Sequence, residues 1–172
     1  MKLSLFLLPC LFIGVSCGQT HKKNATINVN EHIPQYESFE AIAPLFTQAN
    51  DTVYVINFWA TWCKPCVAEL PFFEQLTKEH ATQPVRVILV SLDFPEQIES
   101  KLIPFVRTYE LQSEVIALLD ERFNEWIPRV DSSWGGAIPV THIHKGTQRS
   151  FHHRAFRTYS ELQQLVDQML TR

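Results

Sequence analysis

The chain has 172 residues, enough for one compact domain with a hydrophobic core and little more. Apolar residues make up 45% of the chain and charged residues 19%, as in an ordinary globular protein. The formal net charge is −3, and Lys and Arg neither predominate nor cluster. This composition excludes a surface built to bind a polyanion such as a nucleic acid.

The first residues predict an export signal that ends at a cysteine. Met1 and Lys2 precede an almost unbroken apolar run, residues 3–15, which is too short to span a bilayer as a helix. Small residues then lead to Cys17, a pattern that resembles a bacterial lipobox. Such a segment is cut before its cysteine, so residues 1–16 would be a signal peptide and Cys17 would be lipidated. An ordinary cleaved signal and a buried apolar N-terminus are the alternatives.

Export and lipidation would leave two free thiols in the mature chain. Cys10 would leave with the signal and Cys17 would carry acyl chains, so only Cys63 and Cys66 remain. Several acyl chains on one residue anchor a protein stably to a membrane. We therefore expect a membrane-anchored lipoprotein that faces the periplasm, where a dithiol stays reduced only if a donor supplies electrons.

The remaining chain predicts one α/β domain. Residues 17–34 are expected to hold the lipidated cysteine and a polar tether, in which Ile27 and Val29 could add a short edge strand. Strands and helices then alternate through residues 35–172, which favours a mixed sheet with helices on both faces. Strands are expected at 52–59, 85–91, 114–119, 138–144 and 148–153, and helices at 39–48, 64–80, 96–110, 121–126 and 159–170, with a loop at 128–136. Within 39–48, Pro44 must lie at a kink or mark a break.

A Cys-x-x-Cys pair stands where a buried strand passes into a helix. Cys63 and Cys66 lie three residues apart on the expected first turn, so their sulfurs can bond with little backbone movement. The free N–H groups and the dipole at the helix N-terminus stabilise a thiolate at Cys63, which makes Cys63 the nucleophile. Cys66, one turn further on, is the natural resolving thiol. Pro65 suits a first helical turn because it has no N–H.

Two other interpretations of the cysteine pair are weaker. Half of a zinc site would need two more ligands, and the candidates are histidines far along the chain. A purely structural bridge between residues three apart would close a small loop and stabilise little. The spacing therefore favours a redox-active pair.

The segment Trp62-Cys63-Lys64-Pro65-Cys66-Val67-Ala68-Glu69-Leu70-Pro71 resembles the active site of the thioredoxin superfamily, and within it the TlpA/ResA-like membrane-anchored branch. The resemblance extends from about residue 35 to the C-terminus and implies a thioredoxin fold with an additional βα unit at about 114–126. It also implies that Pro139 is cis and stands beside the dithiol. Trp62, Ile138 and Pro139 would then bind an incoming extended peptide.

Glu69 is the candidate proton carrier. It shares a helical stripe with apolar residues, where burial would raise its pKa and let it hold or pass a proton near Cys66. The resemblance implies such a role, and a solvated helix glutamate is the alternative. Asn57 stands where thioredoxins place a buried aspartate and cannot titrate, so a buried proton carrier would have to come from elsewhere.

Four histidines gather near the C-terminal pair of strands. His142 and His144 alternate along one strand and could share a face, whereas His152 and His153 point oppositely. We expect solvated strand histidines and no metal site. Trp126 and Trp134 are expected to serve packing.

The function that these features predict is thiol–disulfide oxidoreduction on protein disulfides, without a cofactor. The resemblance favours the reductive direction, with a membrane thiol protein as electron donor. A thiol peroxidase usually has a lone peroxidatic cysteine, so the close pair argues against that alternative. A copper(I) chaperone could use the dithiol as soft ligands, and an inert bridge in an interaction module is a further alternative.

Overall fold

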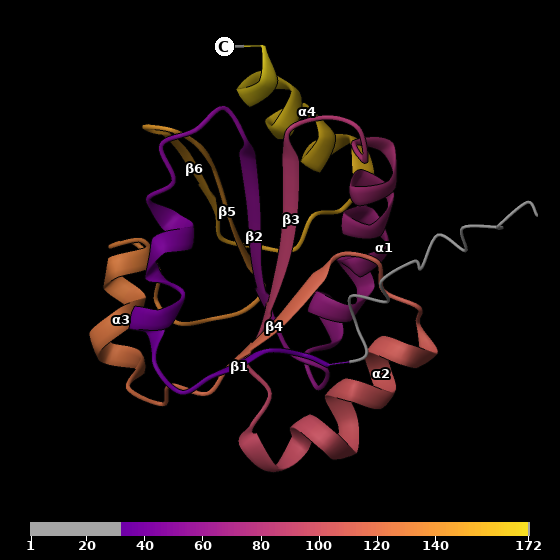
Figure 1. The fold of residues 1–172 in the computed structure, drawn as a ribbon, viewed down its shortest axis with the longest axis vertical. Coiled ribbons are helices and arrows are strands. Elements are labelled where there is room, and N and C mark those ends of the chain that lie inside the picture. Colours follow the sequence, from indigo (N-terminus) through magenta and orange to yellow (C-terminus); the bar gives the residue numbers. More distant parts are fainter. Residues whose placement is uncertain (1–31, 172) are drawn as a thin grey trace, which may run out of the picture.

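The computed structural model describes residues 32–171, which form a six-stranded mixed sheet with helices on both faces (Figure 1). The signal peptide, Cys17 and the Ile27–Val29 strand lie outside the described residues. The strand order is β1-β4-β3-β2-β5-β6. The strands are β1 Gln35–Tyr36, β2 Val53–Trp59, β3 Val85–Ser91, β4 Glu114–Leu118, β5 Val140–Lys145 and β6 Gln148–His152.

The first four strands run parallel and the last two antiparallel. Strands β1, β4, β3 and β2 pair in parallel, β5 runs antiparallel to β2, and β6 closes the edge as a hairpin with β5. Every residue of β2 is buried, as expected of a central strand covered on both faces. The predicted mixed α/β sheet is confirmed, and the expected βα unit corresponds to β4 and the helix after it.

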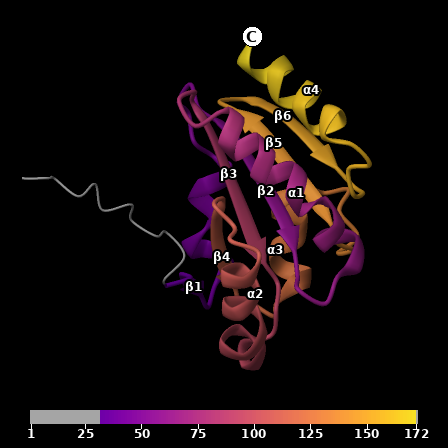
Figure 2. The same cartoon turned by 90° about the vertical axis from the view of Figure 1, so that its right-hand side faces the viewer.

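Two helical layers enclose the sheet. The helices are α1 Lys64–Glu79, α2 Ile103–Thr108, α3 Phe123–Val130 and α4 Tyr159–Leu170. Helices α1, α2 and α4 pack on one face over a core that includes Trp59, Phe73 and Leu162. The other face is covered by α3 and two short 3₁₀ helices, with Trp126 and Phe58 in its core. Figure 2 looks onto the face that carries α1, with α3 behind the sheet.

Prolines account for the helices that the sequence predicted wrongly. The expected helix at 39–48 is two 3₁₀ turns, η1 Phe39–Ala41 and η2 Ala43–Phe46, with Pro44 in the first turn of η2, close to the break that was expected there. The expected helix at 96–110 is a 3₁₀ turn at Pro95–Gln97, a π turn at Ile98–Leu102, and then α2.

Helix α3 departs from expectation in the opposite way. We expected a helix at 121–126 and a loop from 128, yet the helix runs through Pro128 to Val130. The proline removes one backbone N–H from the last turn, and burial of Trp126 and Val130 keeps the turn helical. None of the helices within residues 32–171 is long and apolar enough to cross a membrane.

The expectation of solvated histidines on β5 is wrong. His142 is 2% exposed and His144 is fully buried, and their ring centroids lie 5.3 Å apart. The two histidines are buried because side chains two residues apart on a strand point to the same face, here the face of the sheet covered by η2. His142 contacts Phe46 of η2. Burial lowers the pKa of His142 to about 4, helped by His144 and Arg149.

We expect His142 to make the fold sensitive to acid. Its pKa in the folded state, about 4, lies below the ordinary value of 6.5, so the unfolded chain binds more protons between these pH values. This contribution to stability is complete above pH 6.5 and is lost as the pH falls toward 4, by about 3 kcal/mol at 1.36 kcal/mol per pH unit.

Replacing His142 with Phe should remove this pH dependence. The measurement is the free energy of unfolding in urea between pH 4 and 8 for both proteins. Equal pH dependence in wild type and His142→Phe would contradict the prediction. His153→Phe, at an exposed position, is the matched control and should leave the curve unchanged.

Candidate active site

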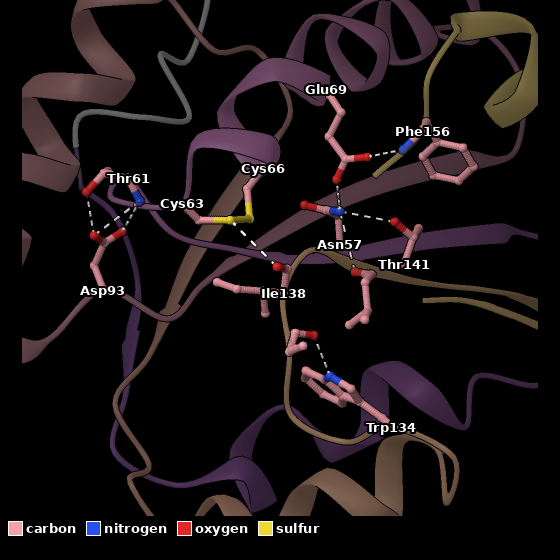
Figure 3. Close-up of a disulfide and its surroundings, with 12 residues drawn as sticks. Asn57, Thr61, Cys63, Cys66, Glu69, Asp93, Trp134, Ile138, Thr141 and Phe156 are labelled. Atoms are coloured by element: carbon pink, nitrogen blue, oxygen red, sulfur yellow. Dashed lines mark hydrogen bonds between the residues drawn. A yellow bond between two sulfur atoms is a disulfide. The ribbon is translucent and has the colours of Figure 1, made fainter. Parts of the chain in front are cut away.

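Strand β2 delivers the chain to the N-terminus of α1, where the two cysteines form a disulfide (Figure 3). Cys63 is the N-cap residue with extended backbone, and Pro65 lies in the first turn. The Cα atoms of Cys63 and Cys66 are 5.3 Å apart. Cys63 is 6% exposed and Cys66 fully buried, so a partner can reach the pair only at Cys63.

A carboxylate that the sequence did not single out holds the loop before Cys63. Both oxygens of Asp93 accept hydrogen bonds from the backbone N–H of Thr61, at 3.2 and 3.1 Å, and Oδ1 also accepts from its hydroxyl. Ser91 donates its hydroxyl to Asp93 at 2.8 Å. The available signal was its place just after β3, because neighbouring parallel strands end at the same edge of the sheet.

The loop before β5 closes over the disulfide. The Ile138–Pro139 peptide bond is cis, as the resemblance implied. The carbonyl oxygen of Ile138 lies 3.8 Å from Cys63 Sγ. On the same loop, the indole N–H of Trp134 donates to the carbonyl of Ala137 at 2.8 Å, which ties the loop to the core beneath it. The loop therefore presents backbone directly beside Cys63 Sγ.

Glu69 is buried rather than solvated. It is 1% exposed, and its carboxylate accepts hydrogen bonds from the backbone N–H of Phe156 at 2.7 Å and from Asn57 Nδ2 at 3.0 Å. Burial raises the pKa of Glu69 to about 7, against these two hydrogen bonds, which lower it. A carboxyl group one turn beyond Cys66 therefore changes its charge near neutral pH.

Asn57 links this carboxylate to the sheet. Its Nδ2 also donates to Thr141 Oγ1 at 3.0 Å and to the carbonyl of Val140 at 3.4 Å. Asn57 is fully buried at the centre of β2, between Glu69 and the disulfide (Figure 3). Sequence reasoning identified the position but assigned it no contacts.

An apolar groove of about 380 Å³ opens beside Cys63. It is lined by Trp62, Leu92, Phe94, Phe123, Asn124, Ile127, Gly135, Gly136 and Ile138. Three aromatic side chains at its edge are unusually exposed: Trp62 at 49%, Phe94 at 45% and Phe123 at 41%. The sequence predicted Trp62 and Ile138 here, but not Phe94 or Phe123, which the fold brings in from the β3 loop and α3.

Comparison with known proteins identifies the family of this chain. The model of the AhpC/TSA family matches residues 44–143, which include the cysteine pair and Pro139. The chain belongs to the AhpC/TSA family. Within the thioredoxin superfamily, this AhpC/TSA-family protein is TlpA/ResA-like, as its active-site segment indicated.

The most informative relatives match only parts of their length. The chain is 31% identical over 108 residues to the thioredoxin-like protein YneN of Bacillus subtilis, covering 61% of this chain and 63% of YneN. It is 40% identical over 57 residues to the thiol-disulfide oxidoreductase ResA of Oceanobacillus iheyensis, covering 33% of this chain and 28% of ResA. The chain thus spans less than two thirds of either relative.

Solved structures agree on the fold. A thiol:disulfide interchange protein of the thioredoxin family from Chlorobium tepidum superposes with a TM-score of 0.59 at 22% identity, covering 71% of this chain and 82% of that one. StoA from Bacillus subtilis gives 0.52 at 18% identity, covering 68% and 84%. Both matches support the thioredoxin fold of this AhpC/TSA-family protein.

The ligand-type side chains of the described residues do not form a cluster that could hold a metal ion. Within 32–171, no group of three or more His, Cys, Asp and Glu side chains is arranged to hold a metal ion. His142 and His144 lie together on β5, whereas His153 is exposed and hydrogen-bonds Ser133 at 3.2 Å. His152 stacks instead on Phe156, with ring centroids 4.2 Å apart.

Proposed function

We propose that the protein is a thiol–disulfide oxidoreductase that reduces protein disulfides outside the cytoplasm. The observation that carries the proposal is the Cys63–Cys66 disulfide at the N-terminus of α1, with the Ile138 carbonyl beside Cys63. The named thiol-disulfide oxidoreductases among its relatives support the same activity.

Cys63 acts as the nucleophile in this proposal. The sulfur of Cys63 lies at the N-terminus of a 16-residue helix, whose dipole and free N–H groups stabilise a thiolate. The thiolate attacks one sulfur of a substrate disulfide, and a mixed disulfide forms as the other substrate sulfur leaves. Cys66 then attacks Cys63 Sγ, which closes the internal disulfide and releases the substrate dithiol.

Glu69 handles the proton of the resolving thiol. Cys66 must lose its proton before it attacks, and it is fully buried, so solvent does not reach it directly. Glu69 lies one turn further along α1, and its pKa of about 7 suits a base that works near neutral pH. The role inferred for Glu69 from the sequence gains support from this burial.

The substrate lies in the apolar groove, which begins at the dithiol. Trp62 and Ile138 flank Cys63 and line the groove together with Phe94 and Phe123. Trp62 and Phe94 stack with ring centroids 6.2 Å apart and leave apolar surface in solvent. An extended peptide that carries apolar side chains beside its cysteine would bury this surface, with Ile138 and Pro139 along its backbone.

The remaining parts of the proposal concern location. Residues 1–16 are a lipoprotein signal peptide, Cys17 carries the lipid, and residues 17–34 tether the domain that follows, 35–172. The protein works on the periplasmic side of a membrane, and a membrane thiol protein returns it to the reduced state. The apolar run and small residues before Cys17 support this part of the proposal.

The test is the reduction of insulin disulfides by the reduced full chain, together with the midpoint potential of the pair in thiol buffers. We expect insulin reduction and a potential near that of thioredoxin, about −270 mV. A potential near −120 mV would make the protein a disulfide donor. Stoichiometric copper(I) binding by the reduced protein, without insulin reduction, would favour the copper chaperone instead.

A further inference from the structure

Asn57 carries a buried acceptor that the oxidised protein does not use. Its Nδ2 hydrogen-bonds Glu69, Thr141 and the carbonyl of Val140, but its Oδ1 is buried without a hydrogen-bond partner. Leaving a buried carbonyl oxygen unpaired costs about 1 to 3 kcal/mol. Such a group in a native protein calls for a physical reason.

The orientation of the amide is determined by its neighbours. The carbonyl oxygen of Val140 can only accept a hydrogen bond, so it requires Nδ2 on its side. The Glu69 carboxylate requires the same when it is ionised. Turning the amide over would place Oδ1 against the Val140 carbonyl, so Oδ1 stays on the opposite side.

That side is the one facing the disulfide. Figure 3 shows Asn57 between Glu69 and the cysteine pair, with its amide oxygen directed toward Cys66. In the oxidised protein Cys66 has no proton to donate. Once reduced, its fully buried thiol becomes a weak hydrogen-bond donor that solvent does not reach, whereas the thiol of Cys63 has the Ile138 carbonyl 3.8 Å away.

We propose that Asn57 Oδ1 accepts a hydrogen bond from the Cys66 thiol that reduction creates, so that Asn57 bridges Cys66 and Glu69. The amide group holds the resolving sulfur on one side and the proton carrier on the other. When Glu69 is ionised it polarises the amide and strengthens Oδ1 as an acceptor. The ionised form of Glu69 and the protonated form of the Cys66 thiol therefore stabilise each other.

The proposal rests on the proposed function for its reaction step. A dithiol of the donor protein reduces the pair: the Cys63–Cys66 bond breaks, one disulfide forms in the donor, and two electrons pass to the pair. The two protons of the donor thiols end on Cys63 and Cys66. The new Cys66 S–H then donates to Asn57 Oδ1, which stabilises the reduced state.

The direct test is the S–H stretching band of Cys66 in the infrared. The full chain with Cys10→Ser, Cys17→Ser and Cys63→Ser has Cys66 as its one thiol. Adding Asn57→Leu removes the acceptor at similar side-chain size and should move the band to higher wavenumber, because a hydrogen bond lowers the S–H frequency. The same band position with Asn57 and with Leu would overturn the proposal.

Thr141→Val is the matched control. It removes a hydroxyl that accepts from the same amide through Nδ2, but leaves Oδ1 in place. The Cys66 band should stay where it is in this variant. A shift of the Cys66 band as large as that of Asn57→Leu would mean that looser packing of the site causes it. That result would overturn the proposed hydrogen bond between Cys66 and Asn57.

A second measurement keeps the proposal testable if Asn57→Leu does not fold. In the same background, Cys66→Ala removes the donor, and the side-chain amide resonances of Asn57 should shift in spectra of ¹⁵N-asparagine-labelled protein. The amide of exposed Asn124 should not shift. Unchanged Asn57 resonances would overturn the bridge.

The reduction equilibrium gives the size of the effect. In the chain with both cysteines intact, Asn57→Leu should lower the equilibrium constant for reduction by glutathione about tenfold. Neither spectroscopic readout uses a substrate. A shifted S–H band without insulin reduction would therefore count against the proposed function alone, and insulin reduction with an unshifted band against the bridge alone.

Discussion

Replacing Cys63 with serine is expected to abolish disulfide reduction, the largest effect of any single substitution in this protein. The serine hydroxyl is not ionised at neutral pH and cannot form a disulfide, so no mixed disulfide with substrate arises. The measurement is insulin reduction by the full chain with a supply of reducing thiol. Turnover of Cys63→Ser above the rate of the thiol alone would sink the assignment of Cys63 as nucleophile.

Cys66→Ser is the informative companion variant. It keeps the proposed nucleophile, Cys63, but removes the thiol that releases the substrate, so the mixed disulfide on Cys63 should accumulate. Gel electrophoresis without reductant should show the adduct for Cys66→Ser and none for Cys63→Ser. The opposite pattern would mean that the roles of the two cysteines are exchanged, contrary to the 6% exposure of Cys63 and the full burial of Cys66.

The helices and strands were predictable wherever the spacing of apolar residues fitted only one of the two. β3 at Val85–Ser91 and α4 at Tyr159–Leu170 match the expected bounds, because a run of buried β-branched residues and an amphipathic stripe each have one interpretation. In 39–48 the sequence predicted a break at Pro44 but not that both pieces would be 3₁₀ turns, and in 96–110 it did not predict the division into a 3₁₀ turn, a π turn and α2. Prolines interrupt both segments, and the packing of the short pieces on the sheet decides their conformation.

In the candidate site, features that depend on local spacing were predictable, and those that depend on tertiary packing were not. The Cys-x-x-Cys pair and its place on a first helical turn were visible in the sequence, since spacing alone brings the sulfurs together. Asp93 and Phe123 were not visible, because they reach the site through the order of parallel strands and the packing of α3. Whether Glu69 is buried depended on Asn57 and Phe156, which are 12 and 87 residues away in the chain.

The burial of Glu69 also predicts a measurable pH dependence of stability. Its pKa in the folded protein is about 7, above the ordinary 4.5, so the folded state binds more protons between these pH values. The contribution of Glu69 to the stability of the wild-type fold therefore falls as the pH rises through this range, by about 3 kcal/mol at 1.36 kcal/mol per pH unit.

Glu69→Gln should remove that loss, so the free energy of unfolding of the variant relative to wild type should be about 3 kcal/mol more favourable at pH 8 than at pH 4. Glu99→Gln, at an exposed position, is the control for a change of charge alone. An unchanged difference between pH 4 and pH 8 would mean that Glu69 titrates as a solvated carboxylate, and the proposed proton transfer from Cys66 would lose its base.

Glu69 and His142 change the stability of the fold with pH in opposite directions, so each contribution is measured best in a variant that lacks the other side chain. The stability from Glu69 falls with rising pH between 4.5 and about 7, while that from His142 rises between about 4 and 6.5, so the two contributions oppose each other in wild type. Burial also lowers the pKa of His144, which adds to the rise with pH in every variant. Relative to wild type, stability should therefore rise more steeply with pH in Glu69→Gln and less steeply in His142→Phe, and the double variant should lie between the two. A double variant outside that range would show that the two buried side chains do not act with opposite sign.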